Sequence, residues 1–432
     1  MQTERAGRPQ DAGSSRDCRH YRIRDPSTGQ ILVEPPDGFL LRGRSDALLQ
    51  SVYRRDFVIR DHEDGLFRFR DWLPVRRTFS GAPGTVAWRA EALGRSMGLS
   101  RLAVAFTGWA PERGATAITG TFKELGAYAL FAAVPHGETR PMVLASAGSS
   151  ARAALEVASL HDLPVIVIVA KDARGQLWTT RPRGRRTLVV AVEGDYGTAS
   201  TLAKALGDHP AVFPSGGVRN VARRDGLGTT LLAAFEQLGR VPEHYVQAVG
   251  SAAGALGAFA MSRRLLEAGL PGVPMRVHLV QNAPFAPIHG AWTAGLPSAV
   301  QAPLPPLYAS VLANRRPPYA ACGGVRDMLH TSRGSTWVAT PAQARRAGAR
   351  FLHHEGIALH PAAQVGLAGL QQAVRDGVVP PDADVLFNAT GSDPTQPIPR
   401  ARIPVTPDVL VDTLAQPSAV VDTILSHWET LP

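Results

Sequence analysis

Short, uniformly apolar runs alternate along the chain with longer segments in which alanine and leucine recur at helical spacing. Apolar runs of about six residues, each followed by an amphipathic segment, are typical of strands and helices in a parallel α/β fold. Since the runs are apolar on both faces, we expect helices on both sides of the sheet. The expected strands are residues 101–106, 141–146, 164–169, 187–192, 244–249, 276–280 and 384–389, and the expected helices are residues 121–134, 150–162, 197–207, 226–239, 254–268, 362–376 and 407–428.

Residues 1–80 follow a different pattern. Turn residues in "PSTG" and "PPDG", both within residues 24–43, predict a hairpin-like extension. Residues 1–17 are polar and carry no apolar segment of the kind found in secretory signals, so we expect a disordered tail. No apolar run in the chain is long enough to span a bilayer.

The composition narrows the class of protein. A chain of 432 residues, 44% of them hydrophobic, is long enough for two lobes of a globular protein. The formal net charge of +10 is not gathered into basic runs with interleaved aromatic residues, which disfavours nucleic-acid binding and is compatible with a small anionic substrate. Two cysteines give neither a disulfide framework nor a metal-ligand spacing, so we expect a cytoplasmic protein without bound metal.

Three of the expected strands end in loops rich in small residues. These loops are "LASAGSSARAAL" at 144–155, "AVGSAAGALGAF" at 248–259 and "FNATGSDP" at 387–394. In open parallel sheets, ligands bind beyond the carboxyl ends of the strands, where small residues let backbone N–H groups approach an anion. Any one loop could simply be a tight turn, but three of them favour one shared ligand.

Lysine is rare in this chain, and one lysine lies among apolar residues. The chain has lysine only at positions 123, 171 and 204, and Lys123 is flanked by Phe122 and Leu125 in "ATAITGTFKELGAYALFA". An amine beside apolar groups has a lowered pKa and can act as a nucleophile, whereas a guanidinium stays protonated. Lys123 is therefore the candidate catalytic residue, with an exposed helical lysine as the alternative.

These motifs resemble those of fold-type II pyridoxal-phosphate enzymes. "TGTFKELGA" is similar to the family's lysine motif "SFKDRG", and the three small-residue loops stand where the family has its substrate-carboxylate loop, its cofactor-phosphate loop and its pyridine contact. Within the threonine synthase branch, the chain resembles the cysteate synthases over roughly residues 65–392. That resemblance rests on seven blocks in the same order: "FTGWAPERGA", "VEGDY", "RNVARRDGLGT", "HYVQAVGS", "QNAPFAPIHGAW", "EGIALHPAAQVGLAGL" and "LFNATG".

The resemblance implies an architecture as well as an activity. It implies a two-lobed, three-layer α/β sandwich like that of the tryptophan synthase β-subunit, preceded here by the N-terminal extension at 1–80. The large, cofactor-binding lobe would comprise residues 81–134 and 211–432, and a small mobile lobe carrying the substrate loop would comprise residues 135–210. It also implies a homodimer.

The resemblance assigns roles residue by residue. Lys123 would form the Schiff base with pyridoxal 5'-phosphate, Thr390 would meet the pyridine nitrogen, and Ser149 would lie near the phenolic oxygen. The cofactor phosphate would be held by Gly250, Ser251, Ala252, Ala253 and Gly254. The substrate would be bound by Ser146, Ala147, Gly148, Ser149 and Ser150 at its carboxylate, and by Asn220 and Arg223 at its phosphate.

The reaction implied is a β-replacement in which O-phospho-L-serine loses phosphate and sulfite adds, giving L-cysteate. Lys123 would remove the α-proton, and the cofactor would serve as the electron sink. The alternatives are a β- or γ-replacement with another nucleophile or substrate, as in threonine synthases or enzymes of specialised metabolism, and a catalytically silent protein that keeps the fold and binds an amino acid or a partner.

The chain departs from the family pattern at two loops. Ser149 stands where the family has asparagine, and Ala253 stands where it has threonine in "GSGTGG". Losing one hydrogen bond to a charged phosphate would cost about 1.5–3 kcal/mol. The N-terminal region also has only Cys18, where relatives often carry cysteine pairs, so no structural zinc is expected.

Overall fold

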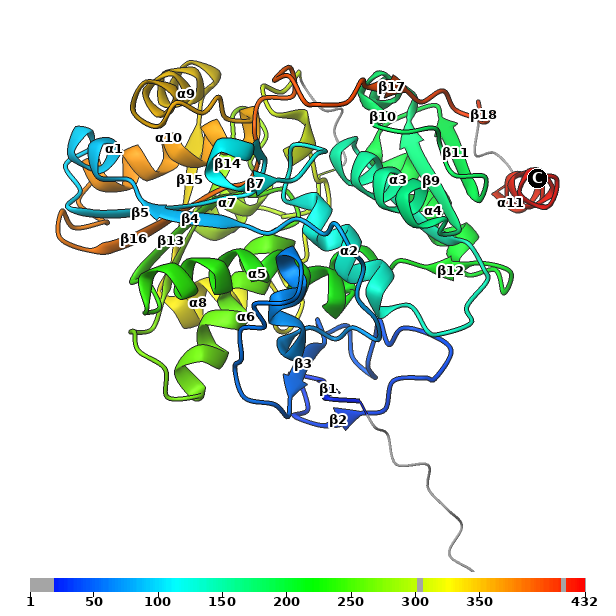
Figure 1. The fold of residues 1–432 in the computed structure, drawn as a ribbon, viewed down its shortest axis with the longest axis horizontal. Helices are drawn as coiled ribbons and strands as arrows, with labels where there is room; N and C mark the ends of the chain where they lie inside the picture. Colours follow the sequence, from blue (N-terminus) through cyan, green and yellow to red (C-terminus); the bar gives the residue numbers. More distant parts are fainter. Residues whose placement is uncertain (1–18, 301–305, 413–416, 432) are drawn as a thin grey trace, which may run out of the picture.

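Two β-sheets, each covered by helices on both faces, form the body of the computed structural model (Figure 1). The structure describes residues 19–300, 306–412 and 417–431. The expected tail at residues 1–17 and Cys18 lie outside these residues. The two parallel sheets confirm the α/β class.

The larger sheet has the strand order β15-β14-β13-β16-β5-β4, with all neighbours parallel except the antiparallel pair β4–β5. Helices α1, α9 and α10 cover one face, and α5, α6 and α8 cover the other (Figure 1). Its elements are β4 (Val86–Arg89), α1 (Glu91–Ser96), β5 (Arg101–Phe106), α5 (Val221–Leu238), β13 (His244–Ala248), α6 (Ala253–Glu267), β14 (Arg276–Asn282), α8 (Val325–Ser332), β15 (Ser335–Ala339), α9 (Pro341–Glu355), α10 (Pro361–Arg375) and β16 (Asp384–Ala389).

The smaller sheet has the order β12-β8-β9-β11-β18 and is parallel throughout. In β9, Val167 faces the core formed by α2 and α3, while Ile166 and Ile168 face the core formed by α4 and α11. The strand sequence is apolar at every position because both of its faces are buried. The elements are α2 (Lys123–Ala133), β8 (Met142–Ser146), α3 (Ser149–His161), β9 (Val165–Ala170), β11 (Thr187–Val192), α4 (Tyr196–Gly207), β12 (Phe213–Pro214), β18 (Val409–Val411) and α11 (Pro417–Glu429).

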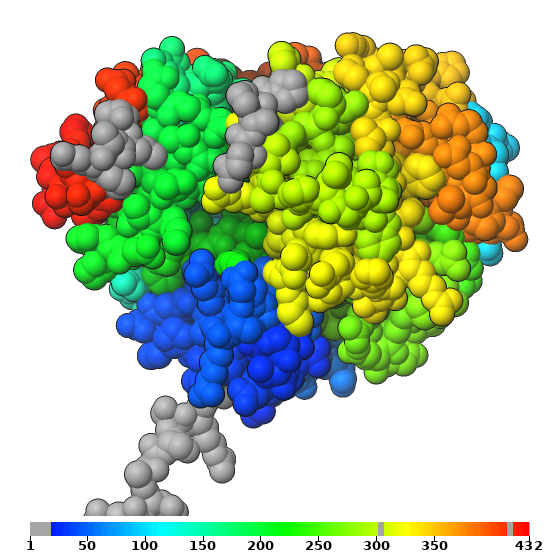
Figure 2. Space-filling model, turned by 180° about the vertical axis from the view of Figure 1, so that it is seen from behind, coloured from blue at the N-terminus to red at the C-terminus, as the bar shows by residue number. Residues whose placement is uncertain are grey.

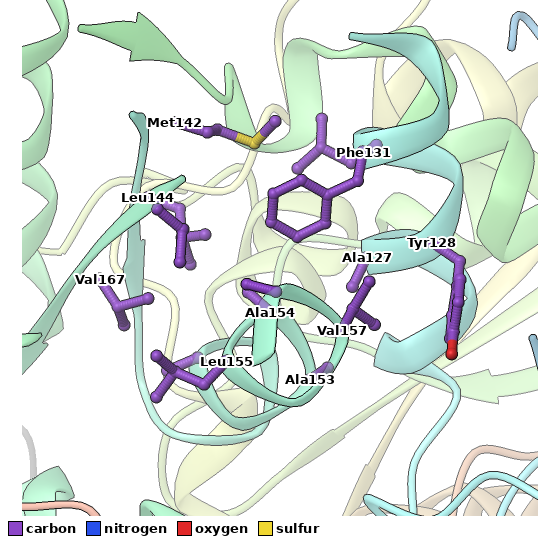
Figure 3. Close-up of a cluster of buried hydrophobic side chains, with 14 of the residues drawn as sticks. Ala127, Tyr128, Phe131, Met142, Leu144, Ala153, Ala154, Leu155, Val157 and Val167 are labelled. Carbon is purple, nitrogen blue, oxygen red and sulfur yellow. The ribbon is translucent and has the colours of Figure 1, made fainter. Parts of the chain in front are cut away.

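Helix α2 joins the two sheets through its packing on α3 and on α5. Figure 3 shows Phe131 of α2 facing Met142 and Leu144 of β8 and the alanine-rich surface of α3. Gly126, on the other side of α2, packs on Leu227 of α5, whose side chain would lie 3.3 Å from an added Cβ. Small residues at these helix contacts let the helix axes come close, which fixes the start of α2 between the two sheets.

The N-terminal extension is a three-stranded antiparallel sheet of β1 (Tyr21–Arg24), β2 (Ile31–Leu32) and β3 (Gln50–Tyr53). The expected hairpin at "PSTG" is confirmed, because β1 and β2 pair across that turn. Tyr53 donates a hydrogen bond to the Asp225 carboxylate of α5 at 2.6 Å, which ties the extension to the larger sheet. Figure 2 shows this N-terminal region, in blue, below the other two parts and bordering a hollow between them.

All seven expected strands are present within a few residues of their expected bounds, and six of the seven helices are too. The expected helix at 407–428 is wrong at its start, because residues 409–411 form strand β18 and pair with β11. Both β12 and β18 also lie on the smaller sheet, although the expected boundaries place residues 211–432 in the large lobe. The two are the edge strands of that sheet, and because they are only two and three residues long they leave a short row of unpaired backbone groups.

Several elements of the structure were not expected from the sequence. Besides α1, β4, α8, β15 and α9 of the larger sheet, they are η1 (Gly65–Trp72), β6 (Trp109–Ala110), η2 (Pro111–Arg113), β7 (Ala115–Thr116), η3 (Lys171–Gln176), β10 (Trp178–Thr179), η4 (Gly217–Arg219), α7 (Pro287–Ala294), η5 (Ser310–Leu312) and β17 (Ile403–Pro404).

Candidate active site

Lys123 is the first residue of α2, at the point where the two sheets meet. The backbone N–H of Phe122 donates to the carbonyl of Thr390 at 3.1 Å, which holds the start of α2 against the end of β16. The Nζ atom of Lys123 lies 4.5 Å from the centroid of the Phe122 ring. Burial and, to a smaller extent, the nearby Arg223 guanidinium lower the pKa of Lys123 to about 7. A large fraction of this amine is therefore unprotonated and nucleophilic near neutral pH.

The loop between β8 and α3 is shaped by Ser146 and Gly148. The Ser146 hydroxyl oxygen accepts hydrogen bonds from the backbone N–H groups of Gly148 at 3.1 Å and Ala151 at 2.8 Å. Gly148 has φ +128°, and an added Cβ would lie 2.6 Å from Oε1 of Gln176, so no other residue fits here. Ser146 thus shapes the loop, and the first turn of α3 presents backbone N–H groups that have no partner within the helix.

Arg223 connects this loop to the lysine. Its Nη2 donates to the hydroxyl of Ser150 at 2.8 Å, and its guanidinium is close enough to Lys123 to lower the pKa of that amine. Burial lowers the pKa of Arg223 itself, although the facing Tyr196 acts in the opposite direction. Three elements, α2, α3 and α5, therefore bring an amine, a hydroxyl and a guanidinium together.

Asn220, expected to hold the substrate phosphate, caps helix α5. Its Oδ1 accepts from the backbone N–H groups of Ala222 at 2.9 Å and Arg223 at 3.4 Å, and its Nδ2 donates to the carbonyl of Ser215 at 3.1 Å. Asn220 is 1% exposed, and both its oxygen and its nitrogen are hydrogen-bonded to backbone groups. Asn220 therefore fixes the helix turn that presents Arg223.

The loop at residues 250–254 joins β13 to the N-terminus of the fifteen-residue helix α6. Ala252 is buried in the left-handed conformation, at φ +61° and ψ +13°. Gly254 lies against the Phe122 ring, where an added Cβ would come within 2.6 Å of Cε2. The turn thus places small residues and the positive end of a helix dipole beside the aromatic neighbour of Lys123, and such an arrangement suits a phosphate.

Thr390 follows directly on β16 and is buried. Thr121 and Gly391 form an isolated bridge, which keeps Thr390 next to the lysine turn. An added Cβ at Gly391 would meet the carbonyl of Gly120 at 2.6 Å, so the two loops touch through backbone alone. A neutral hydroxyl, rather than a carboxylate, is therefore available at this end of the site.

A cavity of about 340 Å³ opens beside these residues, between the two sheets. Its lining includes the polar and aromatic side chains of Ser149, Arg152, Trp178, His360 and Arg402. Burial, and then the nearby Arg152 and Lys123 cations, lower the pKa of His360 to about 4, although Asp393 acts in the opposite direction. His360 is therefore neutral at physiological pH, and its Nδ1 accepts a hydrogen bond from the backbone N–H of Ala362 at 3.1 Å.

The donor set fits pyridoxal phosphate. The site offers an unprotonated amine at Lys123, a helix N-terminus with small residues at 250–254 and a neutral hydroxyl at Thr390. These are the groups needed for an aldehyde, a phosphate and an unprotonated pyridine nitrogen. No group of acidic, histidine or cysteine side chains that could hold a metal ion occurs among the residues that the structure describes.

Comparison with known proteins agrees with this chemistry. The model of the family described as "Pyridoxal-phosphate dependent enzyme" matches residues 113–391, which include Lys123, Arg223, the first two loops and residues 387–391 of the third. This chain is a member of the pyridoxal-phosphate dependent enzyme family. The expected cofactor and the expected assignment as an enzyme are confirmed at the level of the family.

Two relatives of this family member are similar over most of their length. A cysteate synthase of Methanosphaerula palustris is 38% identical over 381 residues, covering 86% of this chain and 89% of the relative. A cysteate synthase of Methanothrix thermoacetophila is 40% identical over 391 residues, covering 86% and 90%. The expected resemblance to cysteate synthases is confirmed.

Solved structures confirm the fold-type II architecture. A fungal L-serine ammonia-lyase from Rhizomucor miehei superposes with a TM-score of 0.55 at 16% identity, over 80% of this chain and 98% of that one. Maize serine racemase superposes with a TM-score of 0.53 at 13% identity, over 80% and 92%. At these identities the likeness bears on the fold alone.

Three polar groups outside this cavity have partners within the fold. Arg113 donates to the carbonyl of Glu355 at 2.9 Å and stacks on Trp88. Asp195, in the turn before α4, caps that helix by accepting from the backbone N–H of Gly197 at 2.7 Å. In "HHE" at 353–355, the carboxylate of Glu355 accepts from the Trp88 indole at 2.8 Å, so the cluster forms no metal site.

The sequence did not reveal Trp178, His360 or Arg402, which line the cavity. Trp178 lies on β10 and Arg402 lies directly before β17, and these two strands pair although they are more than 200 positions apart. Arg152 lies within the loop sequence at 144–155, three residues after Ser149, which is the only signal that could have pointed to it. The others become visible only when the two sheets are placed together.

Proposed function

We propose that this enzyme catalyses a β-replacement in which sulfite displaces phosphate from O-phospho-L-serine, giving L-cysteate. The observation that carries the proposal is the similarity to cysteate synthases over most of the chain, with a low-pKa lysine at the centre of the matched region. Two groups of arginine side chains beside that lysine supply the positive charge that two anionic reactants require.

The residues divide into those that hold the cofactor and those that hold the substrate. Lys123, the loop at residues 250–254 and Thr390 would hold pyridoxal phosphate, with Ser149 near its ring oxygen. When bound, the cofactor supplies an electron sink for the carbanion formed at the substrate's α-carbon. The neutral Thr390 hydroxyl would leave the pyridine nitrogen unprotonated, which would favour replacement over transamination.

The substrate carboxylate would bind to the backbone N–H groups in the first turn of α3, where the helix dipole is favourable. The Arg223 fork would bind the substrate phosphate, with the Ser150 hydroxyl that it already contacts at 2.8 Å. Ser146, Gly148 and Asn220 would act through the backbone turns that they fix. Ala147 lies in the same loop as part of the carboxylate site.

Lys123 would move the α-proton. Its Nζ, unprotonated near pH 7, accepts the proton as the bond to phosphate breaks, and it returns the proton after the carbon–sulfur bond has formed. The reaction then balances without an oxidant: a C–O bond is exchanged for a C–S bond, and phosphate leaves with the electron pair.

The setting of the enzyme is part of the proposal. No helix in the described part of the chain is long and apolar enough to cross a bilayer. We propose a cytoplasmic enzyme that acts as a homodimer, with a small anionic amino acid as its substrate and no nucleic-acid partner. We also propose that the substrate loop between β8 and α3 belongs to a mobile lobe built on the smaller sheet.

A panel of activated amino acids tests the substrate assignment. Purified enzyme loaded with pyridoxal phosphate is mixed with O-phospho-L-serine or with O-phospho-L-homoserine, and inorganic phosphate is measured. The proposal predicts release from phosphoserine alone. Release only from phosphohomoserine would identify threonine synthase chemistry, and release from neither, with no visible cofactor band, would identify a silent binding protein.

A further inference from the structure

The cavity beside Lys123 is lined by the side chains of two arginines, Arg152 and Arg402. The guanidinium carbons of Arg152 and Arg402 lie 4.9 Å and 5.0 Å from the centroid of the Trp178 ring. No carboxylate lines the cavity. Burial lowers the pKa of Arg152, and Glu124 acts electrostatically in the opposite direction but does not line the cavity. Two cations sharing one indole are held there by the fold, at a cost in mutual repulsion that an anion would offset.

Arg152 and Arg402 are both anchored, which leaves part of each guanidinium directed at the cavity. Arg152 is 5% exposed, and its Nε and Nη2 donate hydrogen bonds to the carbonyl of Thr119 at 3.2 Å and 2.9 Å. Arg402 donates from Nη2 to the carbonyl of Gln396. The Nη1 group of each makes no hydrogen bond in the part of the chain that the structure describes. These two donors, on side chains that are already ordered, are suited to an oxyanion.

The cavity is next to the lysine but separate from the Arg223 side. His360 lines it, and this imidazole is close enough to both Arg152 and Lys123 for each cation to lower its pKa. Ser149 also lines it, whereas the hydroxyl of the next residue, Ser150, is bound by Arg223. The first turn of α3 therefore lies between the cavity, which Ser149 lines, and the Arg223 guanidinium, which binds Ser150.

We propose that the cavity formed by Arg152, Trp178 and Arg402 is the binding site for the incoming sulfite, distinct from the Arg223 site that holds the leaving phosphate. This inference rests on the proposed function and names the subsite that the nucleophile occupies. Separate sites explain why one chain carries both groups of arginine side chains around a single lysine. Separate sites also allow sulfite to bind before phosphate has diffused away.

Calorimetry on the holoenzyme tests the sulfite site without requiring turnover. Sulfite is titrated into the wild type, Arg402→Gln, Arg402→Lys and the control Arg400→Gln, whose exposed arginine lies two residues away. We expect at least tenfold weaker sulfite binding for Arg402→Gln, a smaller loss for Arg402→Lys and no change for the control. Val311→Glu, which adds a carboxylate to the cavity wall without altering either arginine, should weaken sulfite binding as well.

Kinetics on the same variants separates this inference from the proposed function. The KM for sulfite should rise at least tenfold in Arg402→Gln and stay unchanged in Arg400→Gln, and phosphate release from phosphoserine without sulfite is measured on the wild type to score the proposed function separately. If the wild type binds sulfite through Arg402 but releases no phosphate, the proposed function fails and the anion site stands. Unchanged sulfite binding in Arg402→Gln and Val311→Glu overturns the site. Inorganic phosphate binding that depends on Arg402 and not on Arg223 overturns the assignment to sulfite.

Discussion

Arg223 of α5 donates a hydrogen bond to the hydroxyl of Ser150 at 2.8 Å, across the junction of the two sheets. The bond joins the first turn of α3 to the residue whose charge also depresses the pKa of Lys123. Under the proposed function, substrate binding and the state of the catalytic amine would depend on the same guanidinium. Two measurable consequences follow from its removal.

Arg223→Gln should lower kcat/KM for phosphoserine by about 10- to 100-fold, because a charge-assisted hydrogen bond to the phosphate is worth about 1.5–3 kcal/mol. It should also move the acid limb of the pH–rate profile upward, since the guanidinium lowers the pKa of Lys123. Steady-state kinetics from pH 6 to 9 measures both. Arg263→Gln, which alters an exposed pair with Glu267 on α6, should change neither. An unchanged pH–rate profile in Arg223→Gln would show that this guanidinium does not influence the pKa of Lys123.

The amine of Lys123 should react with pyridoxal phosphate as a base of pKa about 7. The rate of cofactor uptake by the apoenzyme should rise between pH 6 and pH 8 and then level off, because only the unprotonated amine adds to the aldehyde. Stopped-flow absorbance follows the uptake. Lys123→Arg should retain no cofactor after borohydride reduction, since a guanidinium does not deprotonate. A rate that keeps rising toward pH 10 would mean that the amine is not desolvated.

Glu124 should make the enzyme less stable as the pH rises from about 4.5 to 7. Burial raises the pKa of this carboxyl to about 7, although hydrogen bonds from Thr119 oppose the shift. The folded state then binds more protons than the unfolded state in that window, so the free energy of unfolding falls as the pH rises through it. The full difference is about 3 kcal/mol.

Urea unfolding of Glu124→Gln at pH 4 and pH 8 tests whether the free energy of unfolding falls with rising pH because of Glu124. The glutamine variant cannot titrate, so its stability relative to the wild type should increase by about 3 kcal/mol between the two values. Glu112→Gln, at an exposed position, provides the matched control and should show a constant difference. Parallel profiles for Glu124→Gln and the wild type would show that the carboxyl titrates normally.

Ala252 should tolerate glycine but not valine. Its φ of +61° is unfavourable for any side chain and most unfavourable for a β-branched one. Ala252→Val should lower the free energy of unfolding by about 2 kcal/mol and weaken cofactor binding, while Ala252→Gly should stay within about 1 kcal/mol of the wild type. Thermal unfolding and fluorescence titration with pyridoxal phosphate measure the two effects. Equal stability of the valine and glycine variants would contradict the backbone conformation.

The sequence predicts the local parts of this fold well because their signals are local. The apolar run at 187–192 is buried on both faces of the smaller sheet, and its period and length suffice to identify it. Strand β18 is different. Its three residues, 409–411, pair with β11, which is more than 200 positions away in the sequence. The strand therefore forms because of this long-range pairing, which no local pattern predicts. The helix expected at 407–428 was predicted from the helical spacing of its apolar residues, which carries no information about pairing with a distant strand.

The candidate site divides in the same way. Lys123 was found from one unusual residue in a lysine-poor chain. Asn220 and Ser146 were expected to contact the substrate. In the structure their side chains hydrogen-bond to backbone groups of neighbouring turns. Matching a motif does not tell a residue that contacts the ligand from one that shapes the loop. Trp178 and Arg402 meet through the pairing of β10 with β17, and no periodicity or spacing in the sequence joins them.

The most direct test of the central claim is the fate of sulfite in a complete reaction. The holoenzyme is incubated with O-phospho-L-serine and ³⁴S-labelled sulfite, and products are analysed by mass spectrometry alongside a phosphate assay. The account predicts labelled L-cysteate and phosphate in equal amounts, with both lost in Lys123→Ala. Phosphate accompanied by pyruvate and ammonia, with no label in any amino acid, would contradict it.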